Sequence, residues 1–151
     1  LKGKREMYVP YNSYRLHSAE QDYDELALPG YIDPSYLRYE LHRVWVVEAR
    51  LRDGSRHINP KRTYYLDEDS YQNLMVDHYD DDGELWRYSE SHPINFYDAL
   101  AFWSTLEIHY DLQQKRYTAF RLNPEKPVPP FNTAMKDSEV TPQSLRRKGR
   151  R

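Results

Sequence analysis

Apolar and polar residues alternate with a period of two along much of this chain. The segment WSTLEIHYDLQ, residues 103–113, has apolar residues on one side and mostly polar residues on the other, which is the pattern of a half-buried strand. Its apolar side consists of Leu106, Ile108, Tyr110 and Leu112. LHRVWVVEARLR, residues 41–52, also alternates but is apolar on both sides in its middle, which predicts a long central strand.

Four further segments continue this pattern. They are RHINPKRTYYLDE (56–68), QNLMVDHYD (72–80), ELWRYSES (84–91) and RYTAFRL (116–122). Pro60 cannot donate a ladder hydrogen bond, so we expect the first of them to pair only at an edge or a bulge. At least six strands joined by short polar turns predict a mainly β protein: one curved antiparallel sheet with one or two short helices.

Helix signals occur at two places. Asp33-Pro34 before SYLRYE and Thr141-Pro142 before QSLRRKG each place a capping residue ahead of a proline at the first helical position. Residues 11–32 and 123–140 are rich in Pro, Asn, Ser and acidic residues without clear periodicity. We therefore expect loops or surface-hugging segments there.

The run Asp80-Asp81-Asp82-Gly83 lies between two alternating segments. If Gly83 were the sixth position of a calcium-binding EF-hand loop, the twelfth would be Ser89, where a bidentate carboxylate is needed. The flanks are also strand-like, whereas an EF-hand requires helices. The run is therefore predicted to be a hairpin turn in which Asp82-Gly83 tolerates positive φ.

Aromatic residues partly replace aliphatic ones in this chain. It has 15 tyrosines, 3 tryptophans and 4 phenylalanines, although its hydrophobic fraction is only 38%. Such residues favour strands and also line ligand grooves. Residues 136–151 form a polar to basic tail, with five basic residues among the last six, so the remainder of the chain is acidic. An acidic body argues against nucleic acid as a partner, whereas the tail allows peripheral contact with an anionic membrane.

No catalytic or metal motif was found in the sequence. There are no cysteines, no Gly-rich phosphate loop and no GxSxG elbow, and no nucleophile lies at a readable spacing from a base. Glu107 and His109 share a strand face, but such pairs are common on solvated faces. The carboxylates of residues 67–69 fall in a turn-like polar run where we expect them to be solvated. These features predict no enzyme activity, no metal and no cofactor.

The segment HPINFYDALAFW, residues 92–103, concentrates apolar side chains between two strands. It contains Phe96, Phe102 and Trp103. As a cover over the concave face of the sheet, it would either close the core or shield a ligand cavity.

Three runs resemble a known family. They are IDPSYLRYELHRVWVVEA (32–49), KGKREMYVPYNSYRL (2–16) and YYLDEDSYQNLMVDHYDDDGELWRYSE (64–90). Together they resemble an uncharacterised family of Gram-negative envelope proteins labelled outer-membrane lipoprotein-sorting proteins. The order strand, acidic turn, strand in LDEDSYQNLMVDHYDDDGELW is also similar to the lipoprotein carrier and receptor LolA and LolB, whose fold is an incomplete antiparallel barrel that holds acyl chains.

The resemblance implies a single domain over residues 1–151, the C-terminal part of a longer LolA/LolB-like protein. It implies a non-catalytic periplasmic carrier or receptor for a lipid or a lipoprotein acyl chain. It also implies association with the outer membrane. Leu1 in place of Met also suggests a longer precursor. The predicted ligand-binding residues are Leu74, Val76, Phe96, Phe102, Trp103, Leu106, Ile108 and Tyr110. The alternative is a protein interaction module for an envelope transporter or an outer-membrane protein; a glycan-binding groove is a third hypothesis.

Overall fold

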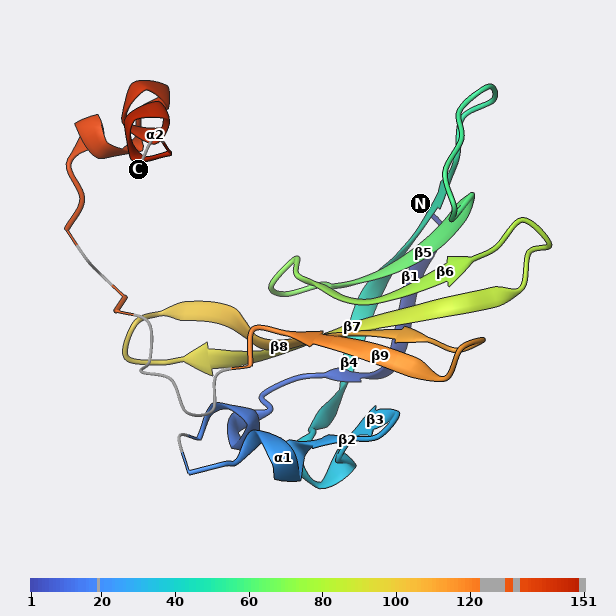
Figure 1. Ribbon diagram of the computed structural model, residues 1–151, viewed down its shortest axis with the longest axis horizontal. Helices are drawn as coiled ribbons and strands as arrows, with labels where there is room; N and C mark the ends of the chain where they lie inside the picture. The colour runs from blue at the N-terminus through green and yellow to red at the C-terminus, as the bar shows by residue number, and fades with distance from the viewer. Residues whose placement is uncertain (19, 123–129, 132–133, 150–151) are drawn as a thin grey trace.

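Seven strands form one antiparallel sheet in the computed structural model, which describes residues 1–18, 20–122, 130–131 and 134–149. Their order is β1-β4-β5-β6-β7-β8-β9, and β1 and β9 are its two edges, so the sheet is not closed (Figure 1). The strands are β1 (Gly3–Pro10), β4 (Tyr39–Arg50), β5 (Lys61–Asp67), β6 (Asn73–Tyr79), β7 (Leu85–Phe96), β8 (Ala101–Asp111) and β9 (Arg116–Phe120). The predicted fold class, a mainly β protein with an open antiparallel sheet and two short helices, is confirmed.

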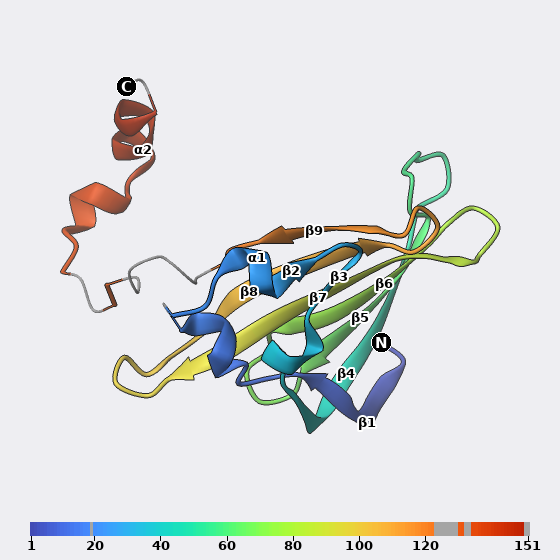
Figure 2. The same cartoon turned by 60° about the horizontal axis from the view of Figure 1, so that its bottom comes forward.

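Between β1 and β4 the chain leaves the sheet over residues 11–38. This segment packs against one face of the sheet, which we call the covered face (Figure 2). Its elements are η1 (Tyr14–His17), α1 (Tyr23–Leu26), β2 (Ala27–Leu28), β3 (Tyr31–Ile32) and η2 (Pro34–Tyr36). Leu16, Leu26 and Ile32 are buried there against Leu106 and Ile108 of β8. The opposite side of the sheet is called the open face.

The cover was assigned to the wrong segment from the sequence. Residues 92–103 do not cross the sheet: they form the ends of β7 and β8 and the turn that joins them. The alternation continues through His92, Ile94 and Phe96, which are buried, so the period of the strand persists to its end. Pro93 is accommodated because the register of the β7–β8 pair shifts there. The segment that covers the sheet is residues 11–38.

Pro60 was also expected to place β5 at an edge or a bulge, and this was wrong. The strand begins one residue later, at Lys61, and pairs on both sides with β4 and β6. The missing N–H of Pro60 therefore removes no ladder bond, while its carbonyl accepts the Leu51 N–H at 2.7 Å. A proline immediately before a strand is compatible with a central position.

The DDDG run is a hairpin turn between β6 and β7, as predicted. Gly83 has φ +82° and donates its N–H to the Asp80 carbonyl at 3.1 Å. Asp80 Oδ1 accepts the N–H groups of Asp82 and Glu84 at 3.2 and 2.9 Å. One carboxylate therefore holds the turn through backbone hydrogen bonds.

Both predicted helix starts are present. Asp33 accepts the Ser35 N–H at 2.8 Å ahead of η2, and Thr141 accepts the Ser144 N–H at 3.2 Å ahead of α2 (Pro142–Lys148). The segment η3 (Asp137–Val140) precedes α2, and Figure 1 shows both lying away from the sheet. Arg146, Arg147 and Lys148 lie in the last turn of α2, where the helix dipole favours cations. Most of the loop expected over residues 123–140 lies outside the described residues, as do Arg150 and Arg151.

The buried Glu90 links β7 to β4, and the buried His92 beside it contacts the cover. Glu90 of β7 accepts hydrogen bonds from the hydroxyls of Tyr39 and Tyr88 at 3.0 and 3.1 Å. Its other oxygen lies 3.2 Å from His92 Nε2, but the ring N–H is not directed at it and makes no hydrogen bond within the described residues. Ser13 of the cover contacts the opposite ring atom, Nδ1, at 3.0 Å. Burial and the Glu90 charge raise the pKa of Tyr39 and of Tyr88 above the ordinary range, so both remain neutral donors.

Replacing Glu90 with alanine is expected to lower the free energy of unfolding by about 3 kcal/mol, because two buried tyrosine hydroxyls lose their acceptor. The matched control is Glu107→Ala on the neighbouring strand, whose partly exposed pair with Arg121 contributes less than about 1 kcal/mol. Urea unfolding followed by tyrosine and tryptophan fluorescence measures both. Equal losses in the two variants would contradict a special role for the buried carboxylate.

Candidate functional site

On the covered face, Leu16, Leu26 and Ile32 pack directly against β8. Leu106 and Ile108 are fully buried, and Tyr110 packs beside them against the same cluster. On this face lie also Met75 and Glu90, which are opposite one another in the β6–β7 pair. Side chains of this chain itself therefore fill the covered face in the described structure.

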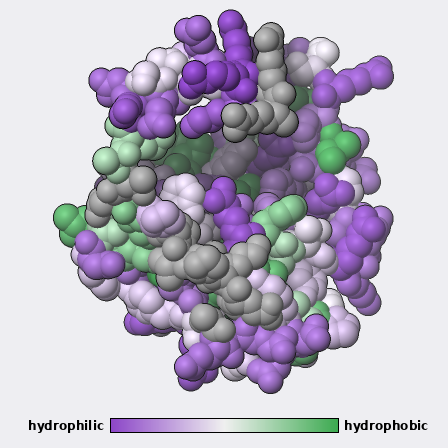
Figure 3. Space-filling model, turned by 60° about the vertical axis from the view of Figure 1, so that its left-hand side comes forward, coloured by the Kyte–Doolittle hydropathy of each residue, from purple (hydrophilic) through white to green (hydrophobic). Residues whose placement is uncertain are grey.

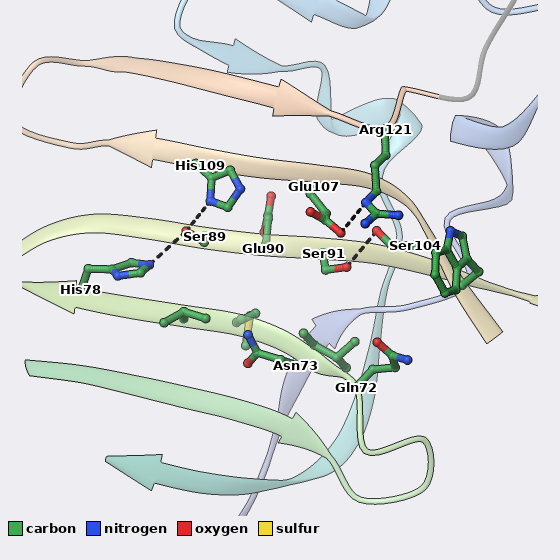
Figure 4. Close-up of a pocket in the computed structure, with 14 residues that line it drawn as sticks. Gln72, Asn73, His78, Ser89, Glu90, Ser91, Ser104, Glu107, His109 and Arg121 are labelled. Atoms are coloured by element: carbon green, nitrogen blue, oxygen red, sulfur yellow. Dashed lines mark hydrogen bonds and ion pairs between the residues drawn. The ribbon is translucent and has the colours of Figure 1, made fainter. Parts of the chain in front are cut away.

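The open face carries a pocket of about 390 Å³. Directly opposite residues of an antiparallel sheet share a face, and Val76, Ser89 and His109 are opposite one another across β6, β7 and β8. Figure 4 shows that His78, Ser89, Ser91, Glu107 and Arg121 lie around the same hollow. The pocket is lined by Gln72, Asn73, Leu74, Met75, Val76, His78, Ser89, Glu90, Ser91, Trp103, Ser104, Glu107, His109 and Arg121, of which Met75 and Glu90 belong by strand register to the covered face and border the pocket from there.

One end of the pocket is apolar. Leu74 and Val76 lie in its wall and are buried, whereas Trp103 is 48% exposed. The Arg121 guanidinium lies 5.3 Å from the centre of the Trp103 ring and 2.9 Å from the Glu107 carboxylate. This cation is therefore already neutralised by a carboxylate. Figure 3 shows a hollow on one side of the molecule, with hydrophobic residues on its walls and hydrophilic residues over most of the surrounding surface.

The other end is built around the Ser89 hydroxyl, which lies between two imidazoles. Ser89 Oγ is 3.1 Å from His78 Nε2 and 2.8 Å from His109 Nδ1 (Figure 4). Asn59 Nδ2 lies 3.3 Å from His78 Nδ1. With Asn59 donating, His78 carries its proton on Nε2 and donates to Ser89, which donates in turn to His109. The three strands are thus linked by one directed chain of hydrogen bonds.

Partial burial, together with the nearby charges of Arg62, His109 and Arg87, lowers the pKa of His78 to about 4 from its ordinary value of 6.5. His78 is therefore neutral near pH 7 and acts as a hydrogen-bonding group rather than as a charge.

A second hollow, of about 410 Å³, shares His78, Ser89 and His109 with the first. Its remaining lining includes Asn59, Arg87, Asp111 and Arg116. The two hollows therefore meet at the Ser89 hydroxyl, with an apolar end on one side of it and an arginine-containing end on the other.

The predicted site residues divide between the two faces. Leu74, Val76 and Trp103 line the open-face pocket. Leu106, Ile108 and Tyr110 belong to the cluster beneath the cover, whereas Val76 lies on the other face, opposite Ser89. Phe102 packs beside Tyr11, with ring centres 4.9 Å apart, and Phe96 lies 4.6 Å from the Phe131 ring. A role of these eight residues in ligand binding stays a prediction.

Sequence reasoning missed the polar part of the pocket. His78, Ser89 and His109 are far apart in the chain, and only the strand register brings them together. Ser89 was on the polar side of a predicted strand, yet it is only 8% exposed. The residue spacing within one strand cannot predict that a serine is buried between histidines of the two neighbouring strands.

The residues considered for metal binding are engaged elsewhere. Glu107 pairs with Arg121, and His109 contacts Ser89. Within the described ranges, His42, Asp67 and Asp69 form a group whose ligand atoms lie within 4.8 Å of one another. Asp67 already contacts His42 Nδ1 at 3.0 Å and accepts the Ser70 N–H and hydroxyl at 2.8 and 2.6 Å. Asp67 is fully buried, so its expected solvation was wrong.

The fold and pocket define a mainly β protein in which an open antiparallel sheet is covered on one face and hollowed on the other. The chain belongs to the family described as "Protein of unknown function (DUF1329)", whose model matches residues 1–146. This finding confirms the resemblance to an uncharacterised family. Among the described residues, no helix is long and apolar enough to cross a membrane.

Two comparisons place the chain among known proteins. It is 45% identical over 150 residues to the Pseudomonas aeruginosa protein named Uncharacterized protein PA3922, and the match covers 99% of this chain and 33% of that protein. The chain thus spans about a third of the length of this relative. A crystal structure of a Vibrio parahaemolyticus domain, described as an outer membrane lipoprotein-sorting protein domain, has 18% identity and a TM-score of 0.43, covering 69% of this chain and 42% of that one.

The lowered pKa of His78 predicts a pH dependence of stability. The unfolded chain binds a proton at His78 near pH 6.5, whereas the folded chain does so only near pH 4. This contribution to stability is therefore present above about pH 6.5 and is lost as the pH falls towards 4. An NMR titration, with the His78 signal assigned from a His78→Gln variant, should show a midpoint near 4; a midpoint at or above 6.5 would contradict the burial of this ring.

Calcium is expected to leave the melting temperature unchanged, because the Asp80 carboxylate already accepts two backbone N–H groups of its own turn. Thermal unfolding with calcium and with a chelator measures this. A calcium-dependent rise that disappears in the Asp80→Asn, Asp82→Asn double variant would refute the interpretation.

Proposed function

We propose that this chain is a non-catalytic binding module for a hydrophobic ligand, such as a lipid or a lipoprotein acyl chain. The observation that carries the proposal is the pocket on the open face, whose lining includes Leu74, Val76 and the half-exposed Trp103. Its volume of about 390 Å³ lies within the range of about 300–1,000 Å³ typical of small-molecule sites. The ligand would therefore lie on the face opposite to the cover.

Binding alone would retain such a ligand. Each buried methylene contributes about 0.8 kcal/mol, so several methylenes over Trp103 and Val76 stabilise a complex without any bond being made or broken. In this proposal Leu106, Ile108 and Tyr110 hold the sheet from its other face, while Phe96 and Phe102 stiffen the β7–β8 hairpin that carries Trp103. The residues that touch the ligand and those that support the wall then belong to the same strands.

A location in the periplasm, with peripheral contact with the outer membrane, is part of this proposal. It follows from the resemblance of three runs to Gram-negative envelope proteins. The polar to basic segment over residues 136–149 supports contact with an anionic membrane surface, because Arg146, Arg147 and Lys148 are exposed.

A second candidate function is an interaction module for an envelope protein. Tyr8 and Leu41 lie opposite one another in the β1–β4 pair and are 67% and 59% exposed. β1 is an edge strand, and an exposed aromatic and aliphatic pair beside a free edge suits docking of another chain. Failure of lipid binding together with loss of a partner in Tyr8→Lys would favour this function.

Trp103→Glu is expected to weaken binding of a fluorescent fatty acid at least about tenfold, because it places a charge in the apolar end of the pocket. The fold should survive, since the ring is half exposed. The matched control is Leu112→Glu, just past β8, where a 44% exposed apolar side chain lies outside the pocket. Fluorescence titration gives the two dissociation constants. Equal binding by both variants and the wild type would remove the pocket from consideration.

A further inference from the structure

The arginine-containing end of the open face has its own chemistry, distinct from the apolar end around Trp103. Arg87 and Arg116 both lie in the hollow that shares His78, Ser89 and His109 with the apolar pocket. The only carboxylate in its lining is Asp111, whose Oδ2 is 3.5 Å from Arg87 Nε. Within the described residues Arg116 makes no ion pair closer than 4 Å. Two guanidinium groups thus face one carboxylate.

The Asp111 carboxylate also accepts hydrogen bonds from neighbouring groups. Its Oδ1 accepts the Trp86 indole N–H at 3.2 Å and the Gln114 N–H at 3.1 Å. These donors and the neighbouring arginines lower the pKa of Asp111 against the effect of its burial. The carboxylate therefore stays charged, but it offsets only one of the two arginines.

The arginines around this hollow also act on His78, whose pKa is lowered. After burial, Arg62 is the next largest cause, and His109 and Arg87 act in the same direction. Asp77 opposes them with the smallest effect of those named. A neutral imidazole, a serine hydroxyl and the two guanidinium groups of Arg87 and Arg116 form a surrounding that favours negatively charged oxygen atoms.

We propose that the ligand of this site is an anionic amphiphile, whose negatively charged head lies beside Arg87, Arg116 and the Ser89 hydroxyl while its hydrocarbon tail extends over Val76 and Trp103. This inference rests on the proposed function and narrows it to a class of ligand. The shared chemistry is a head with negative oxygen atoms, supplied either by a carboxylate or by a phosphate ester.

The arrangement gives a role to the polar cluster that the two hollows share. His78, Ser89 and His109 mark the boundary between the hollow that holds the tail and the hollow that holds the head. The buried Asn59 Oδ1 makes no hydrogen bond among the described residues, which leaves an acceptor for a hydroxyl group of the head or for a water molecule.

The test compares three amphiphiles with the same tail, namely dodecanoate, dodecyl phosphate and dodecanol, each below the concentration at which it forms micelles. Their dissociation constants are measured by competition with a fluorescent fatty acid on the wild-type chain. At least one anion should bind about tenfold more tightly than dodecanol, and this preference should decrease as salt is added. The preferred anion distinguishes the carboxylate from the phosphate ester.

Arg116→Gln should weaken binding of the preferred anion about two- to fivefold and leave dodecanol binding unchanged, since the side chain is exposed and its contribution is screened. Arg146→Gln is the matched control: it removes one positive charge from α2, outside both hollows, and should leave all three ligands unaffected. Circular dichroism verifies that each variant is folded.

The two proposals fail differently. If all three amphiphiles bind equally and Arg116→Gln matches the wild type, the anionic head is overturned while the hydrophobic site stands. If none of the three binds, the proposed function fails and the inference fails with it. The wild type could prefer the anions while Arg146→Gln weakens anion binding as much as Arg116→Gln does. The preference would then arise from overall charge, and the assigned head site would be wrong.

Discussion

Burial of Leu106 and Ile108 beneath Leu16, Leu26 and Ile32 determines which face of the sheet is available. An antiparallel sheet can present one face to water and one to a core, but it cannot leave two apolar faces exposed. Because Leu16, Leu26 and Ile32 occupy the covered face at β8, a ligand at these strands meets a free surface only on the other face.

The buried polar cluster under the cover reinforces the same division. A cover held only by aliphatic contacts could slide along the strands, since hydrophobic packing is not directional. Ser13 contacts His92 at one end of the cover, and Tyr39 donates to Glu90 where the chain re-enters the sheet. The Ser13 contact fixes one end of residues 11–38, because displacing it would leave a buried imidazole without its partner, while the Tyr39 contact fixes the strand that follows them.

The strands and turns were predictable because their information is local. The alternation in β4 and β8, the turn residue Gly83 and the prolines at the starts of η2 and α2 each act within a few residues. The cover was not predictable, because Leu16, Leu26 and Ile32 follow no helix or strand period. The faces were equally hidden: Val76 and Ile108 are both apolar strand residues, and only the pairing of β6, β7 and β8 shows that they point to opposite sides.

The same limit applies to the polar residues of the open face. On a solvated strand face, serine and histidine serve solubility, and their neighbours along the chain do not distinguish that role from any other. The curvature of the sheet distinguishes these residues from ordinary surface residues. Ser89 lies where the sheet is hollowed, so it is buried although no segment of the chain covers it. A hydroxyl in that position must find partners among its cross-strand neighbours, and His78 and His109 supply them. The polar boundary of the pocket is therefore a consequence of sheet geometry acting on residues that the sequence scatters over three strands.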